Sequence, residues 1–416
     1  MGKLMIDGGV PLSGEISVHG AKNSSLPLLA ATLISAGRSV LHNCPQLSDV
    51  DTACRILEHL GCSVQREGDT VTVDSSEMSC SEIPESLMSE MRSSIVFLGA
   101  IAARLGTARV CFPGGCELGP RPIDLHLSAL QQLGLEIQDD HGYLDCTVHG
   151  RLKGAKISLS FPSVGATENI LLAACTAEGE TVINNAASEP EIVDLANFLN
   201  SCGADIRGAG EQSILIRGVD ELHSAEHWVI PDRIVAATYL SCAAATGGEL
   251  FVRNCCPEHL DSVFPVFEEM GCKLIVGRDS IYIRAKSRLN PVKMVRTMPY
   301  PGFPTDAQPP IFTLAAIANG TSVFVENIFE NRFKHVSELL KMGANIKVEG
   351  KVAVIQGVPV LSGANVRAYD LRAGAAMVVA GLAAHGRTTI SDIQHIDRGY
   401  ERIDRDLQQI GARISR

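Results

Sequence analysis

A unit of about seventy residues occurs six times along the chain. Its clearest mark is a glycine that ends an amphipathic segment and precedes a short strand-like segment. Such a glycine is typical of the position just after a helix, where the backbone turns with positive φ. Because each repeat is one structural unit, this pattern constrains the architecture more than any other feature. The six marker glycines are Gly61, Gly134, Gly203, Gly271, Gly343 and Gly411.

The same predicted elements follow one another in each unit. A helix of small apolar residues, such as SLPLLAATLIS, is apolar nearly all round and should therefore be buried. A short strand, an amphipathic helix, the marker glycine and a hairpin such as ANIKVEGKVAVIQ come next. The sixth unit stops at Arg416 without the second strand of its hairpin. We expect KLMIDG at the N-terminus to supply that strand, which would place the first residues in the C-terminal half.

The length and composition predict two domains. A chain of 416 residues exceeds one ordinary core, and its 45% hydrophobic content with a single Trp is typical of α/β or α+β cores filled by Ala, Leu, Ile and Val. Six units divide into three per domain. We therefore expect an inserted domain, residues 21–229, and a discontinuous domain, residues 1–20 plus 230–416, with the active site in the cleft between them.

Charge and cysteine usage exclude several classes of protein. A net charge of −11 argues against a nucleic-acid scaffold. The longest apolar stretch, around Ala373 to Ala384, is too short for a membrane span, and the N-terminus has no signal-peptide pattern, so we expect a soluble cytoplasmic protein without a membrane partner. Thirteen cysteines without a C-x-x-C pair fit neither a disulfide framework nor a zinc site. We expect no metal, no cofactor and no obligate protein partner.

The residues placed at the starts of the six buried helices are all polar. Capping of backbone N–H groups would explain Ser93 or Asp232. A cation at a helix start opposes the helix dipole by up to about 1 kcal/mol, so Lys22, Arg92 and Arg372 need a compensating anion. Guanidinium groups gathered in this way bind phosphates and carboxylates, which predicts a polyanionic substrate. The polar starts are Lys22 and Asn23, Arg92 to Ser94, Thr167 to Asn169, Asp232 and Arg233, Asp306 and Gln308, and Asp370 and Arg372, with Arg121 and Arg398 starting two amphipathic helices.

Several long segments, in order along nearly the whole chain, resemble the UDP-N-acetylglucosamine 1-carboxyvinyltransferase family of enolpyruvyl transferases. They are GAKNSSLPLLAATL, PGGCELGPRPIDLHL, PSVGATEN, YPGFPTDAQP, ENRFKHVSEL, DLRAGAAMVVAGL and HIDRGYERID. The resemblance implies a two-domain α/β (α+β) enolpyruvyl transferase-like fold of six βαβαββ-type units, three per domain, around buried helices. It also implies transfer of the enolpyruvyl group of phosphoenolpyruvate to the 3-hydroxyl of UDP-N-acetylglucosamine by addition and elimination, with release of phosphate, as the first committed step of peptidoglycan biosynthesis.

The resemblance also implies residue roles for that chemistry, which needs a proton donor to the methylene carbon and a base for the sugar hydroxyl. Cys116, on a glycine-rich loop, matches the acid, which can form a covalent adduct and is the expected target of fosfomycin. Asp306 matches the base and Asp370 a second carboxylate near the reacting carbons. The residues expected at phosphoenolpyruvate are Lys22, Asn23, Arg121, Arg372 and Arg398.

A second set of residues matches contacts to UDP-N-acetylglucosamine or their supports. For Leu125, Val164 and Ile328, packing in the core is an equal contender. One position departs from the pattern, because Phe161 stands where some members have a Lys, and its ring could stack on uracil or only pack. The matching positions are Asn23, Arg92, Arg121, Pro122, Ile123, Asp124, Leu125, Ser163, Val164, Gly165, Asp306, Ile328 and Arg332.

Three alternatives remain open at this point. The shikimate-pathway enolpyruvyl transferase shares the six-unit architecture but lacks a PGGC loop with a functional thiol. A catalytically silent paralogue that binds UDP-sugars would keep the fold without turnover. A nucleic-acid end-processing enzyme built on related repeats would show a basic stripe that this chain lacks.

Overall fold

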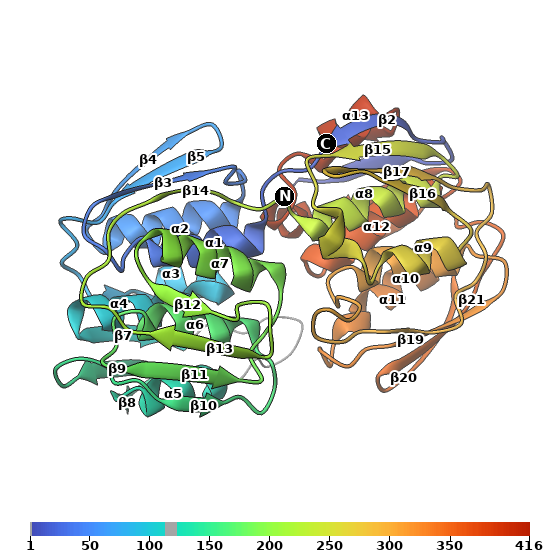
Figure 1. Ribbon diagram of the computed structural model, residues 1–416. Helices are drawn as coiled ribbons and strands as arrows, with labels where there is room; N and C mark the ends of the chain where they lie inside the picture. Colours follow the sequence, from blue (N-terminus) through green and yellow to red (C-terminus); the bar gives the residue numbers. More distant parts are fainter. Residues whose placement is uncertain (1, 113–122) are drawn as a thin grey trace. The chain divides into compact units, whose positions relative to one another are not determined.

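The structure is a computed structural model that describes residues 2–112 and 123–416. Contacts divide these residues into two compact units, coloured along the sequence in Figure 1. The inserted unit comprises residues 20–112 and 123–230, and the discontinuous unit comprises residues 2–19 and 231–416. Each unit contains three four-stranded sheets and three buried helices.

All six sheets have the same order: a short edge strand, the strand that follows the buried helix, and the two strands of the hairpin. The edge strand is parallel to its neighbour, and the other pairs are antiparallel. The sheets of the inserted unit are β14 (Glu226–Trp228), β3 (Arg38–His42), β5 (Thr70–Asp74) and β4 (Ser63–Glu67); β6 (Glu82–Ile83), β7 (Thr107–Cys111), β9 (Tyr143–Val148) and β8 (Leu135–Asp140); and β10 (Lys156–Ser158), β11 (Glu180–Asn184), β13 (Ser213–Arg217) and β12 (Asp205–Arg207).

The discontinuous unit repeats this order, and its third sheet confirms the prediction for the N-terminus. There β1 pairs antiparallel with both β23 and β24, so the first strand of the chain completes the sixth unit. The sheets are β2 (Ser13–Ser17), β15 (Glu249–Arg253), β17 (Ser280–Arg284) and β16 (Lys273–Val276); β18 (Val295–Arg296), β19 (Thr321–Val325), β21 (Val352–Gln356) and β20 (Asn345–Glu349); and β22 (Asn365–Arg367), β23 (Arg387–Ser391), β1 (Leu4–Asp7) and β24 (Arg413–Ser415).

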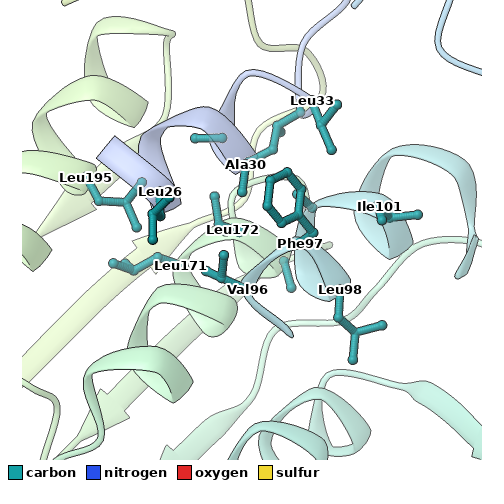
Figure 2. Packing of buried hydrophobic residues seen from close by; sticks show 14 of the residues in the cluster. Leu26, Ala30, Leu33, Val96, Phe97, Leu98, Ile101, Leu171, Leu172 and Leu195 are labelled. Carbon is teal, nitrogen blue, oxygen red and sulfur yellow. The ribbon is translucent and has the colours of Figure 1, made fainter. Parts of the chain in front are cut away.

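The buried helices form the centre of each unit. They are α1 (Lys22–Ala31), α4 (Phe97–Leu105) and α6 (Val164–Ala174) in the inserted unit, and α8 (Arg233–Ala245), α10 (Gln308–Ala316) and α12 (Leu371–Ala383) in the discontinuous unit. Figure 2 shows side chains of α1, α4 and α6, among them Ala30, Phe97 and Leu172, packing together. The predicted fold of six units around buried helices is confirmed. Among the described residues, no helix combines the length and hydrophobicity that a bilayer span requires.

The amphipathic helices end at the marker glycines, as predicted. All six glycines have φ between 87° and 100°, a range that an L side chain adopts only with strain. The helices are α2 (Ser48–His59), α5 (Asp124–Gln132), α7 (Pro190–Ser201), α9 (Phe264–Glu269), α11 (Val336–Lys341) and α13 (Ile403–Gln409). The last three are short, because 3₁₀ turns η2 (Pro257–Leu260), η3 (Arg332–His335) and η4 (Ile393–Arg398) precede them.

Two predicted helix starts are wrong. Thr167 to Asn169 lie inside α6, because Ser163 caps that helix four residues earlier than Thr167 by accepting a hydrogen bond from the Ala166 N–H. Arg398 ends η4 instead of starting the amphipathic helix α13. The second buried helix is also preceded by a short helix α3 (Glu85–Glu90) and a 3₁₀ segment η1 (Arg92–Val96), so Ser93 is not a cap.

Candidate active site

Asp306 lies between two buried arginines in the discontinuous unit. One carboxylate oxygen accepts a hydrogen bond from Arg332 Nη2, and the other lies 3.1 Å from Arg372 Nη2. Arg332 is 2% exposed and Arg372 is 3% exposed, so both charges are removed from water. Buried guanidinium groups are stable only when paired, and Asp306 is the anion that the sequence pattern required for Arg372. The arrangement fixes the position of a partly exposed carboxylate.

A second carboxylate holds the two loops on either side of this pair. Glu326, 3% exposed, accepts hydrogen bonds from the Thr305 hydroxyl and from the backbone N–H groups of Ile328, at 2.8 Å, and Phe329, at 3.0 Å. Arg332 Nη2 also donates to the Thr305 carbonyl at 2.9 Å. The loop that carries Asp306 is therefore bound to the loop that carries Ile328.

Asp370 caps the helix that carries Arg372. Its Oδ1 accepts hydrogen bonds from the backbone N–H groups of Arg372, at 2.8 Å, and Ala373, at 2.9 Å. Burial alone would lower the pKa of Arg372, but Asp306, Tyr400 and Asp232 outweigh burial and raise it. Arg372 is thus a permanent cation that contacts Asp306 through its side chain and Asp370 through its backbone.

His335 is a neutral group beside this cluster. Its Nδ1 lies 3.1 Å from the Arg332 carbonyl, so Nδ1 carries the proton and donates it. Burial lowers the pKa of His335 to about 4, although the nearby Asp370 carboxylate acts in the opposite direction. The His335 ring also packs edge-on against Phe312 of α10. It therefore adds no charge at neutral pH and supports the segment that begins at Arg332.

In the inserted unit, the cation at the start of α1 has a carboxylate partner. Lys22 Nζ lies 2.5 Å from Asp49 Oδ2, and both side chains are nearly buried. Nearby, Asp194 accepts a hydrogen bond from the Ser24 hydroxyl and lies 2.8 Å from His227 Nε2. Asn23, which lies between Lys22 and Ser24 in the sequence, is half-buried. An anionic ligand at Lys22 would have to share this cation with Asp49.

Six of the predicted nucleotide-sugar contacts lie at the starts of two neighbouring helices of this unit. Asp124, exposed, and Leu125, half-buried, begin α5, and buried Ile123 precedes them. Ser163 caps α6, and Val164 and Gly165 form its first turn. A Cβ at Gly165 would lie 2.8 Å from His126 Cε1, so the absence of a side chain there lets α5 and α6 approach closely.

The same helix carries a carboxyl group with a raised pKa. Burial raises the pKa of Glu168 to about 8, and Glu191 and Glu189 at the start of α7 add to the shift. At neutral pH Glu168 is therefore mostly a protonated, uncharged acid. The inserted unit thus keeps this helix free of charge, in contrast to the charged starts of α10 and α12.

Not every predicted site residue can be placed. Cys116, Arg121 and Pro122 lie outside the described residues. Arg92 is the first residue of η1, Arg398 is half-buried at the end of η4, and Phe161 is 43% exposed ahead of α6. The structure brings Asp306, Arg332, Arg372 and Asp370 together in one unit.

Sequence reasoning missed the groups that hold these residues in place. Asp49 and Asn169 bond to partners distant in the sequence, Lys22 and Ile95, and Asn169 was predicted only as a polar helix start. Glu326 and His335 bond to the nearby Ile328 and Arg332, but no residue pattern marks them. Asp49, for example, reads as an ordinary acidic residue in the first turn of α2. A search for buried acids near each predicted cation would have found it only with the fold in hand.

Comparisons with known proteins agree with this picture. Residues 6–407 match the family model described as EPSP synthase (3-phosphoshikimate 1-carboxyvinyltransferase). The chain is 55% identical over 416 residues, with 100% of both chains covered, to UDP-N-acetylglucosamine 1-carboxyvinyltransferase 2 of Caldanaerobacter subterraneus subsp. tengcongensis. It is 51% identical to UDP-N-acetylglucosamine 1-carboxyvinyltransferase 1 of Symbiobacterium thermophilum, covering 100% of this chain and 95% of that one.

Solved structures show the same relationship. The enolpyruvyl transferase NikO from Streptomyces tendae superposes with a TM-score of 0.90 at 28% identity, covering 99% of this chain and 98% of that one. EPSP synthase from Acinetobacter baumannii, at 20% identity and a TM-score of 0.77 over 100% of both chains, shares the fold. With the family model and full-length relatives in agreement, the chain belongs to the enolpyruvyl transferase family.

Proposed function

We propose that the chain transfers the enolpyruvyl group of phosphoenolpyruvate to the 3-hydroxyl of UDP-N-acetylglucosamine, releasing phosphate, in the cytoplasm as the first committed step of peptidoglycan biosynthesis. The observation that carries this proposal is the 55% identity, over all of both chains, to a curated relative named for this activity. The two substrates are small polyanions, which fits the buried cations near the helix starts.

Asp306 is the proposed base. The two guanidinium groups of Arg332 and Arg372 orient its carboxylate, and a carboxylate oxygen is the atom that would accept the proton of the sugar hydroxyl. The hydroxyl oxygen then bonds to C2 of phosphoenolpyruvate while a proton is added to C3. In the elimination step C3 loses a proton and the C2–O bond to phosphate breaks. Asp370, which shares Arg372 with Asp306, is the second carboxylate assigned to the reacting carbons.

Cys116 is the proposed proton donor to C3, and Lys22, Asn23, Arg121, Arg372 and Arg398 are the proposed partners of the phosphate and carboxylate of phosphoenolpyruvate. Lys22 is nearly buried, which strengthens its interaction with an anion, although Asp49 already shares its charge. Glu326 supports the base by holding the Asp306 loop against the loop of Ile328.

The starts of α5 and α6 are proposed to bind the nucleotide sugar, together with the segment that begins at Arg92. Free backbone N–H groups at helix starts interact favourably with anions such as a diphosphate. Arg332 and Ile328, on the loops around Asp306, are assigned to the sugar end of the same substrate.

The test is phosphate release by the purified protein. Release from phosphoenolpyruvate with UDP-N-acetylglucosamine but not with shikimate 3-phosphate is the expected result. Release with shikimate 3-phosphate alone would reassign the chain to the shikimate reaction. Binding of the nucleotide sugar without any release would support a catalytically silent paralogue.

A labelling experiment tests the acid. Fosfomycin should label the wild-type protein once and stop phosphate release, and Cys116→Ser should remove the label. Cys111 is the control, because its thiol is buried and burial raises its pKa. Labelling that persists in Cys116→Ser but disappears in Cys111→Ser would move the reactive thiol to Cys111. Activity in Cys116→Asp is compatible with the proposal, since a carboxylic acid also donates a proton.

A further inference from the structure

The side-chain amide of Asn169 is inserted into a helix of another repeat. Its Oδ1 accepts a hydrogen bond from the Gly99 N–H at 2.8 Å, and its Nδ2 donates to the Ile95 carbonyl at 2.9 Å. In a continuous α-helix, the Gly99 N–H would donate directly to the Ile95 carbonyl, four residues earlier. The amide of Asn169 thus bridges one broken hydrogen bond of the helical ladder.

This insertion lies at the point where the helix changes type. The chain forms the 3₁₀ segment η1 up to Val96 and the α-helix α4 from Phe97 onward. Insertion of a side chain into the hydrogen-bond ladder is a known cause of a helix bend. Figure 2 shows Val96 and Phe97, the two residues at the junction, beside Leu171 and Leu172 of α6. The direction of the segment that begins at Arg92 is therefore set by a residue of α6.

The same amide also contacts a third helix. Asn169 Nδ2 lies 2.8 Å from His126 Nδ1 of α5. The contact of Oδ1 with an N–H donor identifies the amide oxygen, so Nδ2 must be the donor and His126 Nδ1 the acceptor. His126 is then neutral with its proton on Nε2. Burial lowers the pKa of His126 to about 4, in agreement with this assignment, while Asp124 acts in the opposite direction.

Each of the three elements joined by Asn169 carries residues assigned above to the nucleotide sugar. Segment η1 begins with Arg92, α5 begins with Asp124 and Leu125, and α6 begins with Ser163 to Gly165. The His126 ring lies against Gly165, so α5 and α6 are also in contact near their first turns. Asn169 itself is 0% exposed, so its contribution acts only through these partners.

We propose that Asn169 is a positioning residue for nucleotide-sugar binding, which holds η1, α5 and α6 in the register that the substrate requires. This inference rests on the proposed function and extends it to a residue that touches no substrate. An apolar residue at position 169 would allow the Gly99 N–H to return to the Ile95 carbonyl. The asparagine therefore selects the interrupted ladder at the junction of η1 and α4, and its loss should move the Arg92 segment without unfolding the unit.

The test compares Asn169→Ala with Asn200→Ala. Asn200 is an exposed control for the loss of a bridging amide, because its amide also makes two hydrogen bonds to backbone, both to Ile206, and joins the end of α7 to β12. We expect Asn169→Ala to raise the KM for UDP-N-acetylglucosamine about tenfold, with the KM for phosphoenolpyruvate and kcat changed less than about threefold. Asn200→Ala should leave all three constants near the wild-type values.

A conservative substitution of the partner sharpens the test. In His126→Gln, the side-chain oxygen can still accept from Asn169, so the KM for the nucleotide sugar should stay within about threefold of the wild type. His126→Leu removes the acceptor and should raise the KM nearly as much as Asn169→Ala does. If Asn169→Ala unfolds, this pair of His126 variants carries the test.

The outcomes separate this inference from the proposed function. An inactive wild-type protein would overturn the proposed function. An active wild type whose KM for the nucleotide sugar is unchanged in Asn169→Ala, or whose two KM values rise equally, would overturn the positioning role alone.

Discussion

The two units share one architecture and differ in the chemistry at their helix starts. In the discontinuous unit, a carboxylate lies at the start of each of the three buried helices. Asp232 and Asp370 cap α8 and α12, and Asp306 precedes α10 and lies between two buried arginines. In the inserted unit, Lys22 at the start of α1 pairs with Asp49 of α2, and Ser163 caps α6 with a neutral hydroxyl. Further inside α6, Asn169 is bonded to His126 and Glu168 is protonated.

This difference indicates a division of labour on one scaffold. Fixed carboxylates paired with arginines suit proton transfer. Neutral hydrogen-bonded groups such as Asn169 and His126 join η1, α5 and α6 without adding charge. The repeated fold thus supplies the same positions twice, and the residues at those positions separate the proposed chemistry from the proposed recognition.

The largest expected effect comes from removing the charge of Asp306. Asp306→Asn keeps the shape of the side chain but removes the proposed base from between Arg332 and Arg372, so kcat should fall about a thousandfold. Asp220→Asn is the control, since this exposed carboxylate of the inserted unit pairs with Arg151, and its kcat should change less than about threefold. Steady-state phosphate release measures both, and a kcat above one tenth of wild type in Asp306→Asn would contradict the assignment.

One buried, neutral histidine in each unit predicts a shared loss of stability in acid. The pKa values of His126 and His335, about 4, lie below the ordinary value of 6.5. As pH falls below about 6.5, these histidines become protonated in the unfolded chain but stay neutral in the folded state. The free energy of unfolding therefore falls until pH reaches about 4, where the folded state also binds the protons. Between pH 7 and pH 5 each histidine should cost about 2 kcal/mol. Urea unfolding measures the free energy of unfolding at pH 7 and at pH 5 for wild type, His126→Gln and His335→Gln. In each variant this free energy should fall by about 2 kcal/mol less than in wild type between the two pH values.

Glu168 gives the inserted unit a pH dependence of opposite sign. Its folded pKa of about 8 lies above the ordinary value of 4.5, so the protonated form stabilises the fold and this contribution is lost as pH rises through about 8. From pH 7 to pH 9 the wild type should lose about 1.4 kcal/mol that Glu168→Gln retains. Unfolding curves of both proteins at the two pH values test this, and parallel changes with pH would show that Glu168 is ionised in the folded state.

The smallest effect tests whether the scaffold itself is equivalent in the two units. Gly134 and Gly343 end equivalent amphipathic helices with φ of 96° and 90°, and a Cβ at either position would meet nothing within 4 Å. The cost of alanine is then backbone strain alone, so each Gly→Ala variant should lose about 1 kcal/mol. Thermal unfolding measures this loss. A difference above about 1 kcal/mol between the two variants would show that the units are not equivalent at these positions.

Several elements could be predicted because their signals are local. The marker glycines, the apolar helices and the spare N-terminal strand follow from residue pattern and position in the repeat, and all are confirmed. Short edge strands such as β6 and β18, of two residues each, have no periodicity to detect and were not located. The start of α6 was placed too late because VGATEN, with a Gly and three polar residues, lacks the apolar run of the later turns although it is already helical.

By itself, the sequence determined the repeated units, the conformations of their elements and which residues resemble a known active site. Only the tertiary structure decided which charges and amides meet. Asp306 and Arg372 are 66 residues apart in the chain, and Asn169 and Ile95 are 74 apart. Backbone preferences act over a few residues and therefore leave a pattern in the sequence. The partners of buried polar groups are chosen only when distant helices pack together, because the cost of burying an unpaired polar group arises only there.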